Sequence, residues 1–338
     1  MSQSQDAPNE REKKYIEIPL HALRLDRVTE FALYLQPSPG KYVLYRNPNL
    51  MFDEEHRDKL EQNGTRSVFI AVADRKLYLR YLEQYLNEII SDPDVSAEEE
   101  SKIVYACATQ LLKEVIEDPS QQEGVKRAHL MVDNAIEHLL KGPDHFMHVF
   151  DKMSFDYHTY THSVNVCVFG LALGQRIGLS REELSRLGAG LLLHDIGKSK
   201  IDEAILNKQG PLSDEEWELM RTHPTRGREI LAQHDGIDPI ALAVVEQHHE
   251  KCTGGGYPHG LQEPEIHFFS KICTLADVFD ALTTQRSYKE ALASFPALKI
   301  MQAEMRTQFH EGLFKEFIRM LGSPISQGLP RPSQRKAA

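Results

Sequence analysis

The sequence predicts an α+β protein of two parts, a small α/β N-terminal domain followed by an all-α helical bundle. Three observations indicate this architecture. Short runs of β-branched and aromatic residues occur before about residue 93. Beyond residue 150 the apolar residues recur at helical spacing, and no alternating strand pattern competes with it. His and Asp residues lie within or just after these helical segments, as expected where ligands project inward from a bundle.

The first 93 residues divide into a polar start and the small α/β domain. Residues 1–14 are polar and are predicted to be disordered, and the domain is predicted to span 15–93. Strands are predicted where Ile, Val, Tyr and Phe are concentrated, at 15–18, 42–45 and 67–72. Helices are predicted from apolar spacing and from stop signals such as Asn63-Gly64, at 52–62 and 74–90.

Helices follow to the end of the ordered chain. Two connecting helices are predicted within 94–149, at about 97–117 and 121–141, with Asp118-Pro119-Ser120 between them. The bundle itself is predicted to span 150–325, and 326–338 to form a loose tail. Inside the bundle, Ser213 and Glu216 match a capping box that begins another helix.

Composition limits the classes of function. The chain has 338 residues, of which 41% are hydrophobic and 26% charged, as in ordinary globular proteins. It contains no apolar run near the roughly eighteen residues of a membrane span, and its polar start lacks a signal-peptide core, so we expect a cytoplasmic protein. The net charge of −11 disfavours nucleic-acid polymers as partners. The four cysteines show no CxxC spacing, which excludes a zinc ribbon and indicates buried thiols.

Five short motifs in the C-terminal half carry seven candidate metal ligands. They are His162, His194, Asp195, His223, His248, His249 and Asp277. Imidazoles mixed with carboxylates are typical of Fe, Mn or Zn centres, whereas Mg prefers oxygen ligands and water. A single His on an apolar helix is more often a core residue. A His-Asp doublet at the end of the apolar run LGAGLLLHD favours a metal site, because charged groups are rarely buried without partners.

Three longer segments resemble a known family. HDIGK, HHEKCTGGGYPHGL and LADVFDALTTQRSYK are similar to the HD-GYP branch of the HD phosphohydrolases, which hydrolyse the bacterial second messenger cyclic di-GMP. The resemblance covers roughly residues 150–322, and Thr253 stands where the family more often has Asp or Asn. It implies an HD-type bundle and a phosphodiesterase that forms pGpG, with GMP as a further product. The expected chemistry is in-line attack on phosphorus by a hydroxide held between two metals.

The resemblance also implies how the ligands are shared between two divalent ions. Asp195 would bridge both ions, one of them held by His162, His194 and Asp277, the other by His223, His248 and His249. Fe and Mn are the expected metals, and Zn, Ni and Co also fit the ligand set. Lys198 follows His194 by four residues, so on a continuing helix it would lie one turn along and stabilise phosphoryl charge. A lysine that only interacts with the helix dipole is the alternative.

Further residues are expected to contact the nucleotide. Besides Lys198 they are Gly256, Tyr257, Pro258, Asp280, Arg286 and Lys289. For Arg286 and Lys289 an exposed surface loop is the alternative. The resemblance also implicates the glycine-rich loop around Tyr257 in contacts with GGDEF-type cyclase domains, and a homodimer stays open.

His158 departs from the pattern of some relatives, which hold a third metal with Glu at this position. It precedes His162 by four residues, so on a helix both would face one cavity. Without the carboxylate a third dication would be poorly compensated beside two others, which predicts a two-metal centre. His158 would then lie beside the ligands or contact substrate, although an imidazole ligand in place of Glu stays open.

Two other functions compete with cyclic di-GMP hydrolysis. A catalytically weak cyclic dinucleotide receptor would be expected to lack a ligand, yet all seven are present. An HD phosphohydrolase for another nucleotide is disfavoured by the HH pair and the GYP loop, but a preference for cyclic GMP-AMP is not excluded. The N-terminal domain carries neither a phosphate loop nor a ligand cluster, so we expect it to regulate or to self-associate.

Overall fold

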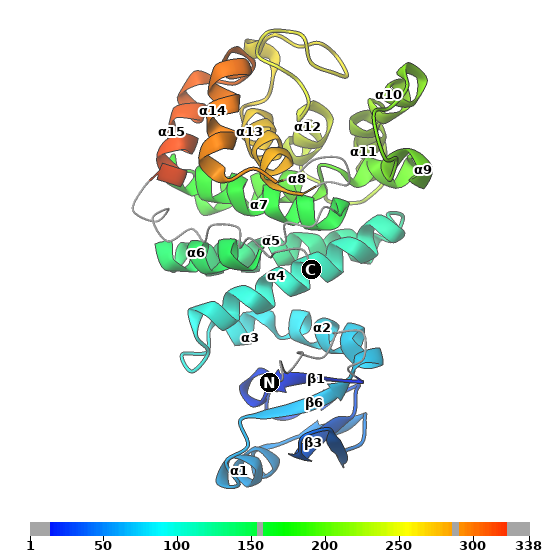
Figure 1. Ribbon diagram of the computed structural model, residues 1–338, viewed down its shortest axis with the longest axis vertical. Helices are drawn as coiled ribbons and strands as arrows, with labels where there is room; N and C mark the ends of the chain where they lie inside the picture. Colours follow the sequence, from blue (N-terminus) through cyan, green and yellow to red (C-terminus); the bar gives the residue numbers. More distant parts are fainter. Residues whose placement is uncertain (1–13, 154–157, 286–290, 323–338) are drawn as a thin grey trace, which may run out of the picture. The chain divides into compact units, whose positions relative to one another are not determined.

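The computed structural model describes residues 14–153, 158–285 and 291–322, without the side chain of Pro143. The chain divides into two compact units, the first ending at Ser96 and the second beginning at Ala97 (Figure 1). The first unit combines small antiparallel sheets with helices, and the second is mostly helical. The predicted α+β fold class is therefore confirmed.

The N-terminal unit contains six strands within the described residues. Four form an antiparallel sheet in the order β1 (Tyr15–Pro19), β6 (Ser67–Ala71), β3 (Leu33–Ser38) and β4 (Lys41–Arg46). The others, β2 (Arg27–Thr29) and β5 (Leu50–Phe52), pair antiparallel with each other. The helices are η2 (Leu20–Ala22), α1 (Glu54–Gln62), η3 (Val72–Asp74), α2 (Arg75–Gln84) and α3 (Leu86–Ile90). In β6 the alternate residues Val68 and Ile70 are buried, as a one-sided sheet requires.

The single helix predicted over 74–90 is wrong, because the chain breaks at Tyr85 into α2 and α3. Tyr85 leaves the helical region, with φ −107° and ψ 17°. Its ring packs 4.9 Å from the ring of Tyr81 and lies under the guanidinium of Arg27 at 5.1 Å. Arg27 comes from another part of the chain, so helical periodicity alone could not reveal this contact at the break. Strands β2, β3 and β5 were also missed, two because they are three residues long and β3 because it contains Pro37.

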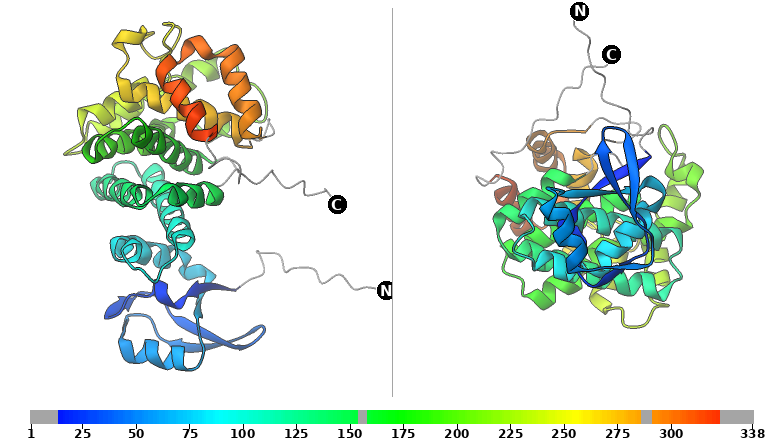
Figure 2. Two further views of the ribbon diagram at one scale, coloured as in Figure 1. Left: turned by 90° about the vertical axis from the view of Figure 1, so that its left-hand side faces the viewer. Right: turned by 90° about the horizontal axis from the view of Figure 1, so that it is seen from below.

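The second unit is a helical bundle whose helices can be followed in Figures 1 and 2. Its α-helices are α4 (Ala97–Glu117), α5 (Gln122–Leu140), α6 (Pro143–Lys152), α7 (Thr159–Arg176), α8 (Arg181–Leu193), α9 (Glu203–Leu206), α10 (Asp214–Met220), α11 (His223–Leu231), α12 (Pro239–Gln247), α13 (Phe268–Thr283), α14 (Ser294–Glu304) and α15 (Glu311–Gly322). Short 3-10 turns are η4 (Ile196–Lys200), η5 (Glu263–Glu265) and η6 (Arg306–Gln308). Ser213 caps α10 through the expected capping box with Glu216. No described helix is both long and apolar enough to span a bilayer.

Helix α7 is the centre of the bundle and is buried over most of its length. It packs against α4, α8, α13 and α15. Gly170 on α7 allows α8 to approach closely, because a Cβ at this position would lie only 2.4 Å from Leu191 Cδ1. This close packing brings together the ends of helices that are far apart in the sequence.

The turn after α8 differs from the expected continuing helix. Helix α8 ends at Leu193, and the 3-10 turn η4 follows. The reason lies in Gly197, where a Cβ would lie 1.9 Å from the His223 carbonyl oxygen and 2.6 Å from the Gly227 nitrogen. The backbone of η4 thus packs directly on the backbone of α11, which an unbroken helix with side chains could not do.

We propose that the functional boundary lies at residue 96/97 and that α4 belongs to the bundle. Its apolar face is buried, with Leu111 at 0% and Leu112 at 1% exposure, and it packs on α7. A fragment of residues 97–338 is therefore expected to unfold cooperatively, whereas a fragment of residues 121–338 should melt at a clearly lower temperature. Thermal unfolding followed by circular dichroism checks this. Equal melting temperatures for the two fragments would contradict the proposal.

Candidate metal centre

The structure brings all seven candidate ligands into one region of the bundle. His162 comes from α7, the His194-Asp195 doublet from the end of α8, and His223 from the start of α11. The pair His248-His249 follows α12, and Asp277 lies on α13. All are buried except His249, whose side chain is 25% exposed. Helix ends therefore supply most of the site.

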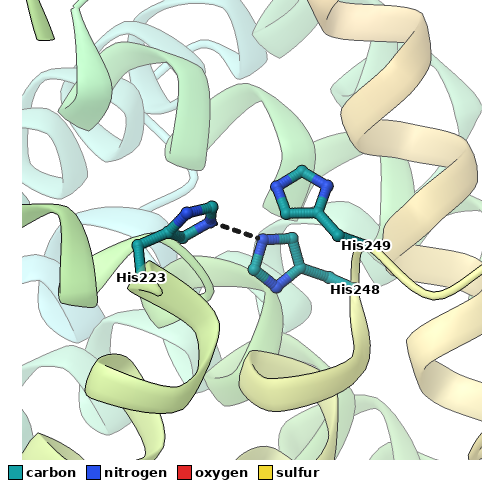
Figure 3. Close-up of side chains that lie close together, drawn as sticks. All are labelled: His223, His248 and His249. Atoms are coloured by element: carbon teal, nitrogen blue, oxygen red, sulfur yellow. Dashed lines mark hydrogen bonds between the residues drawn. The ribbon is translucent and has the colours of Figure 1, made fainter. Parts of the chain in front are cut away.

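The imidazoles and carboxylates form two groups on either side of Asp195. One group is His162, His194 and Asp277, and the other is His223, His248 and His249 (Figure 3). In each group one nitrogen or oxygen of every residue lies within 4.8 Å of the others. These are the same two sets that the resemblance implied.

The two carboxylate oxygens of Asp195 face different groups. Oδ1 lies 3.2 Å from His223 Nε2 and 3.9 Å from His248 Nε2. Oδ2 lies 3.4 Å from His194 Nε2 and 3.7 Å from His162 Nε2. One side chain can therefore serve both groups at once, as a bridging carboxylate does.

Three imidazoles are fixed by backbone carbonyl groups. The Nδ1–H groups donate at 2.8 Å to the carbonyl three residues earlier, in the pairs His194 to Leu191, His223 to Met220 and His248 to Val245. A carbonyl oxygen can only accept, so in each neutral ring the proton is on Nδ1 and Nε2 carries a bare lone pair. Orientation of metal-bound imidazoles by a second hydrogen bond is the usual arrangement in metalloproteins.

Several inward-facing atoms lack hydrogen-bond partners within the part of the chain that the structure describes. His194 Nε2 and Asp195 Oδ1 are buried and have none. His223 Nε2 and His248 Nε2 lie 3.2 Å apart (Figure 3). When both rings are neutral, each of these nitrogens carries a lone pair and no proton. Buried acceptors facing one another are unfavourable unless something positive lies between them. The buried His/Asp clusters therefore fit a metal site of the HD type.

The surroundings hold four of the ligands in the protonation states that metals require. Burial would raise the pKa of Asp195, but Lys198 and His194 lower this pKa well below its usual range. For Asp277 the effect of burial is likewise outweighed, mainly by His162, and its pKa is also lowered. Burial lowers the pKa of His248 well below its usual value, and desolvation lowers the pKa of the partly exposed His249 to about 3. At neutral pH Asp195 and Asp277 are thus ionised and His248 and His249 are neutral, which are the forms in which these groups bind a metal.

Asp280 is placed differently from the expected substrate contact. It is 1% exposed, and its Oδ2 accepts from His162 Nδ1 at 2.7 Å. Its Oδ1 accepts from Asn165 Nδ2 at 2.9 Å and from Thr284 Oγ1 at 3.1 Å. The hydroxyl of Tyr105 on α4 donates to Asn165 Oδ1 at 2.9 Å. We therefore propose that Asp280 orients His162 and that Asn165 and Tyr105, which the sequence did not single out, hold Asp280.

A cleft of about 1120 Å³ opens beside the two groups. Lys198 lines it, and its Nζ lies 2.6 Å from Asp195 Oδ2, although the expected continuing helix is absent. His158 also lines the cleft, but it is the extended residue before α7, with φ −133°, so the expectation that it shares a helix face with His162 is wrong. Arg286 and Lys289 lie outside the described residues.

The glycine-rich loop is fixed by a residue that the sequence did not reveal. Glu250 is 1% exposed, and its carboxylate accepts from the backbone N–H groups of His259, Gly260 and Leu261 at 2.7, 3.1 and 2.9 Å. Gly256 packs on the same segment, where a Cβ would lie 2.5 Å from the Glu250 Cα. The Tyr257–Pro258 peptide is cis, and the Tyr257 ring lies 4.6 Å from that of His249. The only signal for Glu250 was a charged residue directly after the HH pair.

A second His/Glu group lies away from this site, on α4, α5 and α6. It consists of Glu100, His138 and His145. The Glu100 carboxylate already accepts from Lys141 Nζ at 2.9 and 3.0 Å and lies 2.9 Å from His138 Nδ1. An ammonium that occupies the carboxylate satisfies its charge. This group is therefore best explained as a buried ion-pair network that ties the three helices together.

Comparisons with known proteins agree with the site. Residues 156–311 match the family model described as HD domain. A cyclic di-GMP phosphodiesterase of Pseudomonas aeruginosa is 32% identical over 207 residues, which cover 61% of this chain and 50% of that protein. A 3′3′-cGAMP-specific phosphodiesterase of Vibrio cholerae is 30% identical over 244 residues, which cover 67% of this chain and 52% of that protein. The chain thus spans about half the length of these two relatives.

One solved structure shares the fold across nearly the whole chain. It is described as an HDG"Y"P protein from Bdellovibrio bacteriovorus. The superposition has a TM-score of 0.63 and covers 91% of this chain and 99% of that chain, at 20% identity. At this level of identity the match shows the fold alone.

The position of Asp280 leads to a prediction about metal affinity. Asp280→Asn keeps the size of the side chain but removes the negative charge behind His162, so we expect metal binding to weaken by about 10- to 100-fold. Titration of metal-free protein with Mn²⁺ measures this. The matched control is Asp235→Asn at an exposed position. Unchanged affinity in a folded Asp280→Asn variant would refute the orienting role.

Proposed function

We propose that this chain, whose residues 156–311 match the HD domain family model, is a metal-dependent phosphodiesterase that hydrolyses cyclic di-GMP to pGpG. The observation that supports this most is the buried Asp195 carboxylate with one oxygen toward each imidazole group. Paired ligand groups that share a carboxylate are suited to phosphoester hydrolysis. Formation of GMP in a second reaction is part of the same proposal.

Two divalent ions fit the proposed ligand set. His162, His194 and Asp277 would hold one ion, and His223, His248 and His249 the other, with Asp195 shared. We propose Fe or Mn because imidazole and carboxylate are mixed, and Zn, Ni or Co would fit the same donors. When bound, such ions supply Lewis-acid polarisation of the phosphate and activation of water.

The chain's own side chains would position the phosphate and contact the rest of the nucleotide. Lys198 lies at the edge of the cleft, where its ammonium can neutralise a non-bridging phosphate oxygen as charge develops. Tyr257 offers a ring beside His249, and Gly256 and Pro258 shape the loop that carries it. His158 faces the same cleft and would contact substrate in a two-metal centre. Arg286 and Lys289 are proposed as nucleotide contacts from the sequence alone.

A second candidate substrate is 3′3′-cGAMP. The observation in its favour is the similarity to the Vibrio cholerae phosphodiesterase specific for it, which covers 67% of this chain. Both substrates have the same phosphodiester ring, so the metal groups do not discriminate between them. Discrimination between the two substrates would have to come from side chains that contact the bases.

Removal of metal tests the proposed chemistry. Protein treated with a chelator and then desalted should lose hydrolysis of cyclic di-GMP, and Mn²⁺ or Fe²⁺ should restore it, because the buried carboxylates and imidazoles have no catalytic role without a cation. Formation of pGpG is followed by chromatography. Full activity of the metal-free protein would exclude the proposed mechanism.

Substitution of Asp195 tests the bridge. Asp195→Ala should lose both ions, because the side chain faces both groups, whereas Asp277→Ala should affect chiefly the group that contains His162 and His194. Elemental analysis of metal-reconstituted protein measures the number of ions per chain. If Asp195→Ala retains two ions, Asp195 is not shared between them.

A further inference from the structure

The cleft beside the metal groups has a second wall that none of the proposed catalytic residues supplies. Most residues of the segment from Ile205 to Met220, which includes α10, line the cleft together with Lys198 and His249. At about 1120 Å³ the cleft is far larger than a phosphate group requires and has the size of a site for a whole small ligand. The bases of a dinucleotide must lie somewhere in this space if a phosphate lies at the metals.

Trp217 on this wall is the only tryptophan in the chain and is 47% exposed. Its ring lies 6.4 Å from that of Tyr257 at an interplanar angle of 75°, and the Tyr257 ring lies 4.6 Å from that of His249. The guanidinium of Arg221 lies 5.1 Å from the Tyr257 ring and helps to fix it. A row of aromatic rings thus leads from a proposed metal ligand into the cleft. Exposed aromatic faces of this kind are the platforms on which nucleobases stack.

Asp214 supplies a polar group beside that face. It precedes Trp217 by three residues on α10, so the two side chains share one face of the helix, and both line the cleft. It is exposed, and its carboxylate has no hydrogen-bond or ion-pair partner among the residues that the structure describes. A carboxylate only accepts hydrogen bonds. Guanine presents two adjacent donors, N1–H and the N2 amino group, whereas adenine presents a donor beside the N1 acceptor.

We propose that Trp217 and Asp214 form a guanine wall, in which Trp217 stacks on one base and Asp214 accepts hydrogen bonds from N1 and N2 of guanine. This inference rests on the proposed hydrolysis of a cyclic dinucleotide and adds what selects the base. One guanine wall accepts cyclic di-GMP and also 3′3′-cGAMP, which carries one guanine. It rejects cyclic di-AMP, because adenine N1 would face a carboxylate oxygen with no proton between them.

The experiment uses the full, manganese-loaded chain and the three cyclic dinucleotides. In stopped-flow mixing, the emission of the only tryptophan should be quenched by cyclic di-GMP and 3′3′-cGAMP before turnover, and not by cyclic di-AMP. Trp217→Ala should lower kcat/KM for cyclic di-GMP about tenfold, and Trp217→Phe should restore most of it, since a stacked base contributes on this order. Leu219→Ala, at another exposed position of α10 outside the cleft, is the control.

Asp214→Asn tests the choice of base. An amide offers one acceptor and one donor group, which matches adenine, so kcat/KM should fall about tenfold for cyclic di-GMP and rise for cyclic di-AMP. Glu215→Gln on the same turn but outside the cleft is its control. If the unmodified chain hydrolyses no cyclic dinucleotide, the proposed function fails. If it does so and these variants behave like their controls, only the guanine wall is refuted.

Discussion

The rest of the bundle depends on the burial of one carboxylate between two groups of imidazoles. Asp195 is 1% exposed, and a buried charge without compensation is destabilising by several kcal/mol. Lys198 offsets part of this charge at 2.6 Å, but it reaches Oδ2 only. Oδ1 faces the other group without a hydrogen-bond partner among the described atoms. The close packing of η4 on α11, which Gly197 permits, is what brings His223 to that oxygen.

Helix ends explain why three of the ligands need no further side chain to orient them. The last carbonyl groups of a helix have no partner within it. Leu191, Met220 and Val245 lie in the final turns of α8, α10 and α12, and each of their carbonyl groups accepts a hydrogen bond from a ligand imidazole. His162 lies instead near the start of α7, inside the packed bundle, and donates to the carboxylate of Asp280. Whether a ligand imidazole donates to a backbone carbonyl group or to a carboxylate therefore follows from where the ligand lies on its helix.

Sequence motifs predicted the fold class, the helices α4 and α5 to within a few residues, and the two groups of side chains that the structure assembles. They did not predict the positions of side chains that depend on how one helix packs against another. Lys198 was expected on a continuing helix, but the packing of Gly197 on α11 replaces that helix by a 3-10 turn. Asp280 has the same spacing as a residue facing the cleft, yet it lies on the buried side of α13. Neither outcome is encoded in local periodicity.

The division between a buried centre and an exposed wall bears on specificity. The candidate ligands lie on, or at the ends of, helices of the packed bundle such as α7, α8 and α13, where even a small change of side-chain volume disturbs the core. The segment from Ile205 to Met220 that lines the cleft includes residues of the short helices α9 and α10, of four and seven residues, with Trp217 and Asp214 exposed. Substitutions there disturb little packing. Under the proposed function, base preference can therefore change through a few exposed residues while the arrangement of imidazoles and carboxylates stays fixed. The two relatives described above are named for different substrates, cyclic di-GMP and 3′3′-cGAMP, as such a separation would allow.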